Sequence, residues 1–113
     1  MKVSVAVKDG QVIIEPQELV LSLANKDEAL WRCNQGKLEI RFSPRDSPFA
    51  ANLYEAPKGG GCLSGLPSTK FAEKTIQYTV LVTTTDGVFT TSDKLPPERA
   101  PRISIKRKTP APK

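Results

Sequence analysis

Residues 75–91, TIQYTVLVTTTDGVFTT, contain the clearest structural signal in this chain of 113 residues. From residue 76 to residue 82 every second side chain is apolar or aromatic, which is the period of a β-strand with one face against a core. Asp86-Gly87 then supplies the positive φ angles of a tight hairpin turn. If these two residues form the loop, Thr84 faces Phe89 and Phe89 joins the apolar face. The segment predicts a β-hairpin with a buried inner face.

The same alternation recurs along most of the chain. It is clear at residues 2–8, 38–42 and 102–106, and shorter β-forming runs cover 12–14, 19–23 and 29–33. Each run has one apolar and one polar face, as in a sheet that is wet on one side. Short strands separated by turns, with no long helix, predict an all-β fold, an antiparallel or mixed β-sandwich of seven to eight strands.

Residues 44–74 interrupt this pattern with four prolines and four glycines. A compact domain rarely contains so long a loop without local structure. The spacing of Phe49 and Leu53 fits one face of a helix, so we expect a helical turn over Pro48–Tyr54. Phe49, Leu53 and Tyr54 then cap one end of the core.

Charge divides the chain into a body and a tail. The formal net charge is +5, yet residues 99–113 alone contain six basic and no acidic residues. We therefore expect one domain over residues 1–105 and a basic, proline-containing tail over residues 106–113. The tail is either a solvated terminus or a nucleic-acid contact that works through counterion release.

Two cysteines, Cys33 and Cys62, allow one disulfide bond or two thiols. Cys33 lies in an apolar strand-like run, where a free cysteine acts as a small hydrophobe. Cys62 follows Gly59-Gly60-Gly61 in a loop and is the more accessible of the two. Both possibilities remain open from the sequence, although a reducing compartment favours thiols.

The chain contains no histidine. Histidine is the usual proton shuttle near neutral pH and the commonest metal ligand, so Ser/His/Asp, Cys/His and His-ligated metal chemistries each lack a necessary group. We therefore expect a protein that is not an enzyme and has no metal or other cofactor.

The order of the aromatic residues resembles a known superfamily. Trp31, Phe42, Ser47-Pro48-Phe49 and Tyr78 follow one another along alternating strands. This W…F…SPF…Y order is similar to that of small bacterial domains of the cupredoxin-like superfamily, over roughly residues 12–107. The resemblance implies a Greek-key sandwich, with immunoglobulin-like topology as the alternative.

Cupredoxins hold copper with two histidines, a cysteine and an axial methionine. The resemblance implies one ligand before the strand of Ile40 and the others after the strand of Tyr78. Here those places read Gly36-Lys37-Leu38 and Thr83–Gly87, and the only methionine is Met1. The copper site is therefore absent, and the resemblance implies the scaffold alone.

These inferences predict a non-catalytic binding or accessory module whose partner is a protein. Loops on a rigid scaffold usually carry recognition, so we expect the surface to be the sandwich end built from the 44–74 loop and the 86–87 turn. The candidate binding residues are Tyr54, Lys58, Phe71 and Asp86.

Two alternatives use other residues. The first is nucleic-acid association through the basic C-terminal residues, and the second is thiol chemistry at Cys62, which needs a lowered pKa. Neither a signal peptide nor an apolar run long enough to span a membrane is visible, so we expect a soluble, cytoplasmic protein. The basic candidates are Arg102, Lys106, Arg107 and Lys108.

Overall fold

The computed structural model describes residues 1–91 and 100–108. In this part of the chain the only helix is a single 3-10 turn, η1, and the all-β class is confirmed. None of its helices is long and apolar enough to cross a membrane. The strands are β1 (Lys2–Lys8), β2 (Gln11–Glu15), β3 (Glu18–Ser22), β4 (Leu30–Cys33), β5 (Lys37–Arg41), β6 (Leu53–Ala56), β7 (Gly61–Leu63), β8 (Thr75–Gln77), β9 (Thr79–Thr84), β10 (Gly87–Thr90) and β11 (Arg102–Lys106), and η1 spans Thr69–Phe71.

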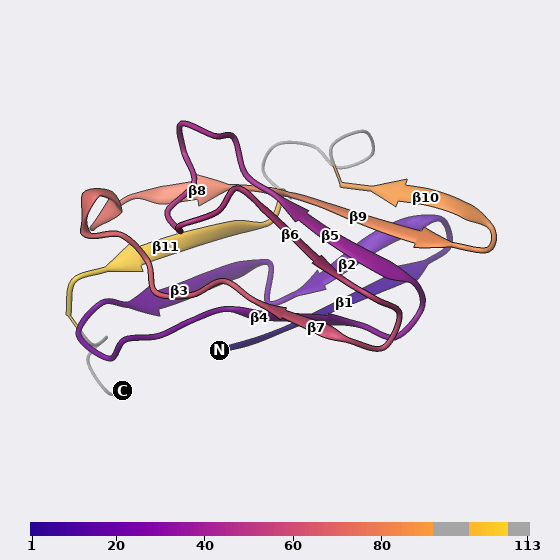
Figure 1. The fold of residues 1–113 in the computed structure, drawn as a ribbon, viewed down its shortest axis with the longest axis horizontal. Helices are drawn as coiled ribbons and strands as arrows, with labels where there is room; N and C mark the ends of the chain where they lie inside the picture. Colours follow the sequence, from indigo (N-terminus) through magenta and orange to yellow (C-terminus); the bar gives the residue numbers. More distant parts are fainter. Residues whose placement is uncertain (92–99, 109–113) are drawn as a thin grey trace.

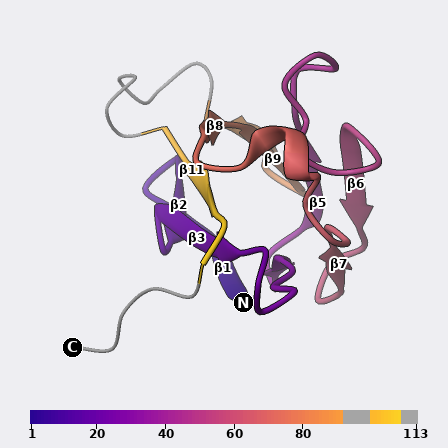
Figure 2. The same cartoon turned by 90° about the vertical axis from the view of Figure 1, so that its left-hand side faces the viewer.

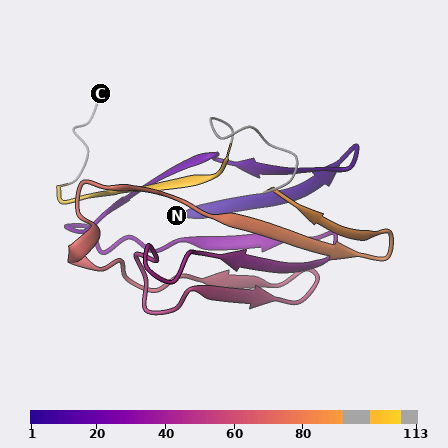
Figure 3. The same ribbon diagram turned by 90° about the horizontal axis from the view of Figure 1, so that it is seen from above.

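Three sheets surround one core, and their strands run along the long axis of the molecule (Figures 1 and 3). Their strand orders are β2-β1-β4-β7, β10-β9-β5-β6 and β3-β11-β8. The pairs β1–β4 and β3–β11 are parallel and the other pairs are antiparallel, so the sandwich is mixed. Figure 2, which looks along the strands, shows the three sheets around the shared interior.

In two places the chain passes from a strand of one sheet to a strand of another with only one or two residues between them. The chain leaves the first sheet at the end of β2 and enters the third sheet at β3, across Pro16, which cannot donate to a ladder. It likewise passes from β8 to β9 at Tyr78, whose N–H donates to the carbonyl of Pro101, 3.1 Å away. Strand β11 lies between β3 and β8 and forms the centre of the third sheet.

The inward faces form one core that follows the predicted alternation. In β1 the valines at 3, 5 and 7 point inward, and in β9 the valines at 80 and 82 are fully buried. Trp31 is 0% exposed, as expected for a core residue. The aromatic residues Trp31, Phe42, Phe49, Tyr54 and Tyr78, named here the aromatic cluster, pack with ring centroids 5.3–6.3 Å apart.

The described residues contain eleven strands, where the sequence predicted seven or eight. Two of the additional strands, β6 and β7, lie within residues 44–74, and the third, β8, arises because the run from Thr75 to Thr85 is divided at Tyr78. The predicted helical turn over Pro48–Tyr54 is wrong. The observed turn is η1, where the hydroxyl of Ser68 caps the turn by accepting from the N–H of Lys70.

The hairpin between β9 and β10 differs by one residue from the prediction. Its loop is Thr85-Asp86, and Gly87 is the first residue of β10, with φ at 133°. Phe89 therefore pairs with Val82 and not with Thr84. Because the pairing shifts by two residues, Phe89 remains on the inner side, where it packs against the core.

Candidate binding site at the turn end

Four tight turns meet at one end of the sandwich, which we name the turn end. They connect β1 to β2, β4 to β5, β6 to β7 and β9 to β10. In Figure 1 this end is at the right, opposite η1. Four separate chain segments therefore present turn residues on one surface.

The side chain of Gln35 fixes the β4–β5 turn to strand β1. Its Oε1 accepts from the N–H of Val7 at 2.6 Å, and its Nε2 donates to the carbonyl of Val7 at 2.9 Å. The primary amide thus takes the place of a backbone partner and extends the parallel pairing of β1 and β4 beyond Val5 and Cys33. The N–H of Gly59 donates to the carbonyl of Cys33 at 2.9 Å and ties the β6–β7 turn to the same place.

Gly36 allows β5 to begin directly against β9. A Cβ atom at residue 36 would overlap the carbonyl of Thr83, which belongs to the backbone and has little freedom to move. Only glycine permits this close approach. The turn is therefore held by Gln35 on one side and by backbone contact with β9 on the other.

Two adjoining depressions occupy the turn end. The larger has a volume of about 700 Å³ and lies between the ends of β6 and β9, across the start of β5. The smaller, about 520 Å³, lies between the β1–β2, β4–β5 and β9–β10 turns. Four residues line both depressions, and we name the two together the groove. The shared residues are Gln35, Lys58, Thr84 and Thr85.

Charge differs between the two halves of the groove. Lys37 and Glu55 line the larger half, and their side chains form an exposed ion pair at 3.9 Å. Asp9 and Asp86 line the smaller half, and Lys58 borders both. The groove therefore offers ammonium, carboxylate, hydroxyl and amide groups, and its lining is mostly apolar in the larger half and mostly polar in the smaller half.

Two of the four candidate binding residues meet here. Lys58 and Asp86 both line the smaller half. Phe71 lies in η1 at the opposite end, with the ammonium of Lys74 5.8 Å from its ring centroid. The expectation that Phe71 shares one surface with Lys58 and Asp86 is therefore wrong. Sequence reasoning missed Gln35 and Gly36, although Asn34-Gln35-Gly36 between two strands is a turn signal.

Tyr54 is a structural residue of the aromatic cluster. Its hydroxyl donates to the carbonyl of Ser64 at 2.8 Å, and its ring centroid is 6.0 Å from that of Trp31. Burial raises the pKa of Tyr54, and the neighbouring Cys62 adds to the rise, whereas the hydrogen bond from Ala51 opposes it. Tyr54 thus packs against the core and does not line the groove.

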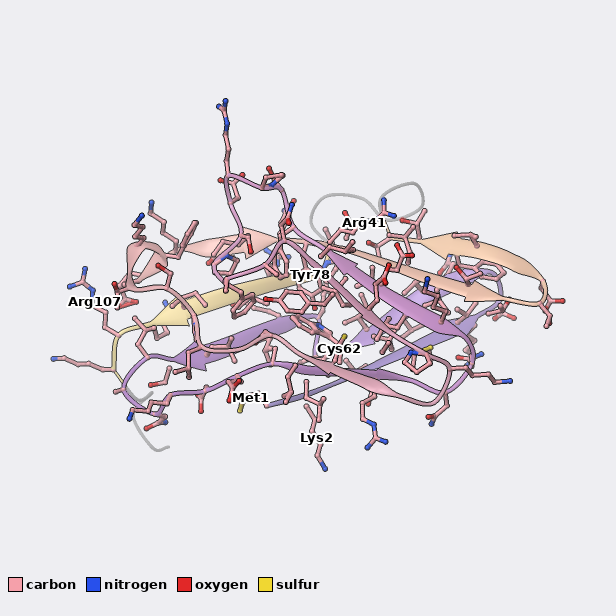
Figure 4. All side chains as sticks on the ribbon, in the orientation of Figure 1. Met1, Lys2, Arg41, Cys62, Tyr78 and Arg107 are labelled. Carbon is pink, nitrogen blue, oxygen red and sulfur yellow. The ribbon has the colours of Figure 1, made fainter. Side chains whose placement is uncertain are left out.

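The disulfide possibility and the thiol alternative both depend on Cys62. Cys33 is buried, Cys62 is half-buried, and both are free thiols. Cys62 lies opposite Trp31 in the β4–β7 pair and points into the body in Figure 4. Burial raises the pKa of Cys62 to about 11, which keeps the thiol protonated near neutral pH and argues against a nucleophilic role.

The four basic candidates do not form one free patch. Arg102 begins β11 and approaches Glu18 at 4.0 Å. Lys106, the first residue of the predicted tail, ends β11 and lies 3.9 Å from Glu73. Arg107 and Lys108 are exposed, and Figure 4 shows Arg107 at the end opposite the groove. Residues 109–113 of the predicted tail lie outside the described residues.

Comparison with known proteins gives no relative. No protein-family model matches the chain, and neither a curated protein nor a solved structure matches it. Within residues 1–91 and 100–108, no three Cys, Asp or Glu side chains gather where they could hold a metal ion. The geometry of the turn end therefore carries the functional argument.

Proposed function

We propose that this protein is a non-catalytic binding module, a cupredoxin-like or immunoglobulin-like sandwich that recognises a protein partner through the groove of the turn end. The observation that carries this proposal is the groove itself, lined by four turns on a scaffold that Gln35 and Gly36 hold rigidly. Exposed turns on a rigid sandwich are typical recognition surfaces. A cytoplasmic location stays a prediction.

The lining favours a segment of polypeptide as the occupant. Its aliphatic part, which includes Ala56 and Pro57, contacts apolar side chains, and the hydroxyl and amide groups of Thr84, Thr85 and Gln35 pair with backbone groups. Lys58, at the boundary of both halves, is the residue that such a partner must contact.

Nucleic-acid binding through the basic residues is the weaker proposal, because Arg102 and Lys106 lie next to carboxylates of the body. Arg107 and Lys108 then form a small electrostatic footprint without an aromatic platform.

A charge-reversal comparison tests the proposal. Wild-type protein, Lys58→Glu and the matched control Lys70→Glu, in η1 at the other end, are each used to capture material from an extract of the source cells. We expect one set of proteins on wild type and on Lys70→Glu that is lost on Lys58→Glu. Equal protein capture by all three, or capture of nucleic acid alone, would overturn the proposal.

A further inference from the structure

The end of the sandwich that carries η1, named here the η1 end, lies opposite the groove. All three strands of the β3-β11-β8 sheet reach it, because the parallel strands β3 and β11 end there and the antiparallel strand β8 begins there. Figure 2 shows this end facing the viewer, with η1 close to the ends of these strands. Segments that are far apart in the sequence therefore present their side chains on one surface.

Basic side chains gather at the η1 end. Lys106 ends β11, and its carbonyl accepts from the N–H of Leu23 at 2.8 Å, which brings the turn that contains Lys26 alongside. On the other side of β11, the N–H of Ile105 donates to the carbonyl of Lys74 at 3.0 Å. Two strand spacings, about 10 Å, separate the two flanking segments. The basic residues of this end are Lys26, Lys70, Lys74, Lys106, Arg107 and Lys108.

Most of these charges have no carboxylate beside them. All of these side chains are exposed, and among the described residues only Lys106 forms an ion pair, with Glu73 at 3.9 Å. Two further acidic residues follow the β3 turn. The carboxylate of Asp27 accepts from the N–H of Ser22 at 3.0 Å, and Glu28 is half-buried. The η1 end therefore has an excess of positive charge, whereas the groove at the turn end mixes both signs.

The η1 end also exposes a large apolar side chain. Leu66 lies in the loop that leads from β7 to η1, and it is 57% exposed. Two residues later Ser68 caps η1, and its N–H donates to the carbonyl of Pro48 at 2.6 Å, which fixes the loop to the body. Leu66 is thus held at the surface, four residues before Lys70. An exposed leucine beside basic side chains favours a ligand that combines negative charge with an apolar phase.

We infer that the η1 end docks reversibly on an anionic lipid bilayer. The ammonium and guanidinium groups contact the charged headgroups, and Leu66 enters the boundary between the headgroups and the acyl chains. Clusters of about four to eight basic residues are of the size that anionic membrane surfaces attract. In this orientation the groove lies at the end away from the bilayer, where a protein partner has access to it.

Nucleic acid is the other polyanion that these charges attract, and the side chains of the η1 end suit it less well. Phosphate contacts offer no hydrocarbon to Leu66. Bases stack on aromatic platforms, but Phe71 packs against the core and has the ammonium of Lys74 5.8 Å from its ring centroid. Lysines act as point charges, which serve on a headgroup layer that has no fixed geometry.

Co-sedimentation of the full chain with lipid vesicles tests the inference. Wild type should bind phosphatidylcholine vesicles that contain about one-third phosphatidylserine, far more weakly bind phosphatidylcholine alone, and dissociate as salt rises. Each basic residue near an anionic surface contributes about fivefold, so Lys70→Glu and Arg107→Glu should each weaken binding by about tenfold or more. The matched control Lys8→Glu, exposed at the end of β1 near the turn end, has the same change of net charge and should bind as wild type does.

Leu66→Ser separates lipid from other polyanions. It should weaken binding to the anionic vesicles severalfold and leave the weaker binding of a short DNA duplex unchanged. The inference would be overturned by wild type that does not bind the anionic vesicles at low salt, or by Lys8→Glu that weakens binding as much as Lys70→Glu. Tighter binding of the duplex than of the vesicles, or unchanged vesicle binding by Leu66→Ser, would also overturn it. None of these results depends on a protein partner at the turn end, so they are independent of the proposed function.

Discussion

The aromatic cluster and the turn end are built on the same kind of strand but differ in where their polar groups lie. In the cluster, polar groups are paired inside the molecule, as where Trp31 Nε1 donates to the Tyr78 hydroxyl at 3.2 Å. At the turn end the backbone is held by Gln35 and Gly36, but Lys58 and Asp86 are exposed. The residues that stabilise the core therefore differ from those of the proposed recognition surface, so each set can be changed separately.

The largest expected effect is on the cluster. Trp31→Ala removes the largest fully buried side chain and leaves a cavity among the other aromatic rings. We expect the free energy of unfolding, measured with urea, to fall by about 3–5 kcal/mol. A loss below about 1 kcal/mol would mean that the cluster does not hold the fold.

The second-largest expected effect is a fall in the free energy of unfolding at alkaline pH, caused by Tyr78 of the aromatic cluster. Burial raises the pKa of Tyr78 to about 12, partly opposed by the hydrogen bond from Trp31, whereas an unfolded tyrosine has a pKa of 10.0. The stability from the protonated phenol is complete below pH 10.0 and is lost as pH rises to about 12. Two pH units correspond to about 2–3 kcal/mol.

Urea unfolding between pH 9 and pH 12 measures this loss. Tyr78→Phe has no phenol to titrate and should lose less stability over the same range, although Cys62, whose pKa is also raised by burial, contributes between pH 9.0 and about 11 in both proteins. Equal alkaline losses in the two proteins would contradict the assignment to Tyr78.

A smaller loss of stability is expected when the hydrogen bonds that hold the β4–β5 turn to β1 are removed. Gln35→Ala removes both hydrogen bonds to Val7 and should lower the free energy of unfolding by about 1–2 kcal/mol. Gln35→Glu keeps the acceptor for the Val7 N–H and loses the donor, so it should fall between wild type and alanine. Faster hydrogen exchange of the Val7 amide in the alanine variant checks that the loss is local.

The smallest expected effect is at Lys58. Its side chain is exposed and makes no ion pair with the described residues, so Lys58→Ala should leave the thermal midpoint within about 1 °C of wild type. A fall of several degrees would show that Lys58 serves the fold, and the separation between the two regions would then fail.

Alternation in the sequence predicted the strands that have one face in the core. Val3, Val5 and Val7 identified β1, because each second side chain must be buried. The sequence did not predict strands β6 and β7. Both are short, and their large aliphatic residues, Leu53 and Leu63, face solvent, so no apolar period marks them.

The site was only partly predictable. Turn residues such as Lys58 and Asp86 could be identified from composition, but the sequence does not say at which end of the sandwich a loop lies. Phe71 was therefore grouped with them although η1 is at the opposite end. The role of Gln35 depends on a partner 28 residues away, Val7, which local pattern does not reveal.

Site-specific photocrosslinking tests the central claim most directly. A benzophenone side chain is placed at residue 58 in the groove and, in a separate protein, at residue 70 in η1, and each is irradiated in an extract of the source cells. The account predicts a crosslinked protein at residue 58 that is absent at residue 70 and is suppressed by excess wild-type protein. The same products at both positions, or none at residue 58, would contradict recognition through the turn end.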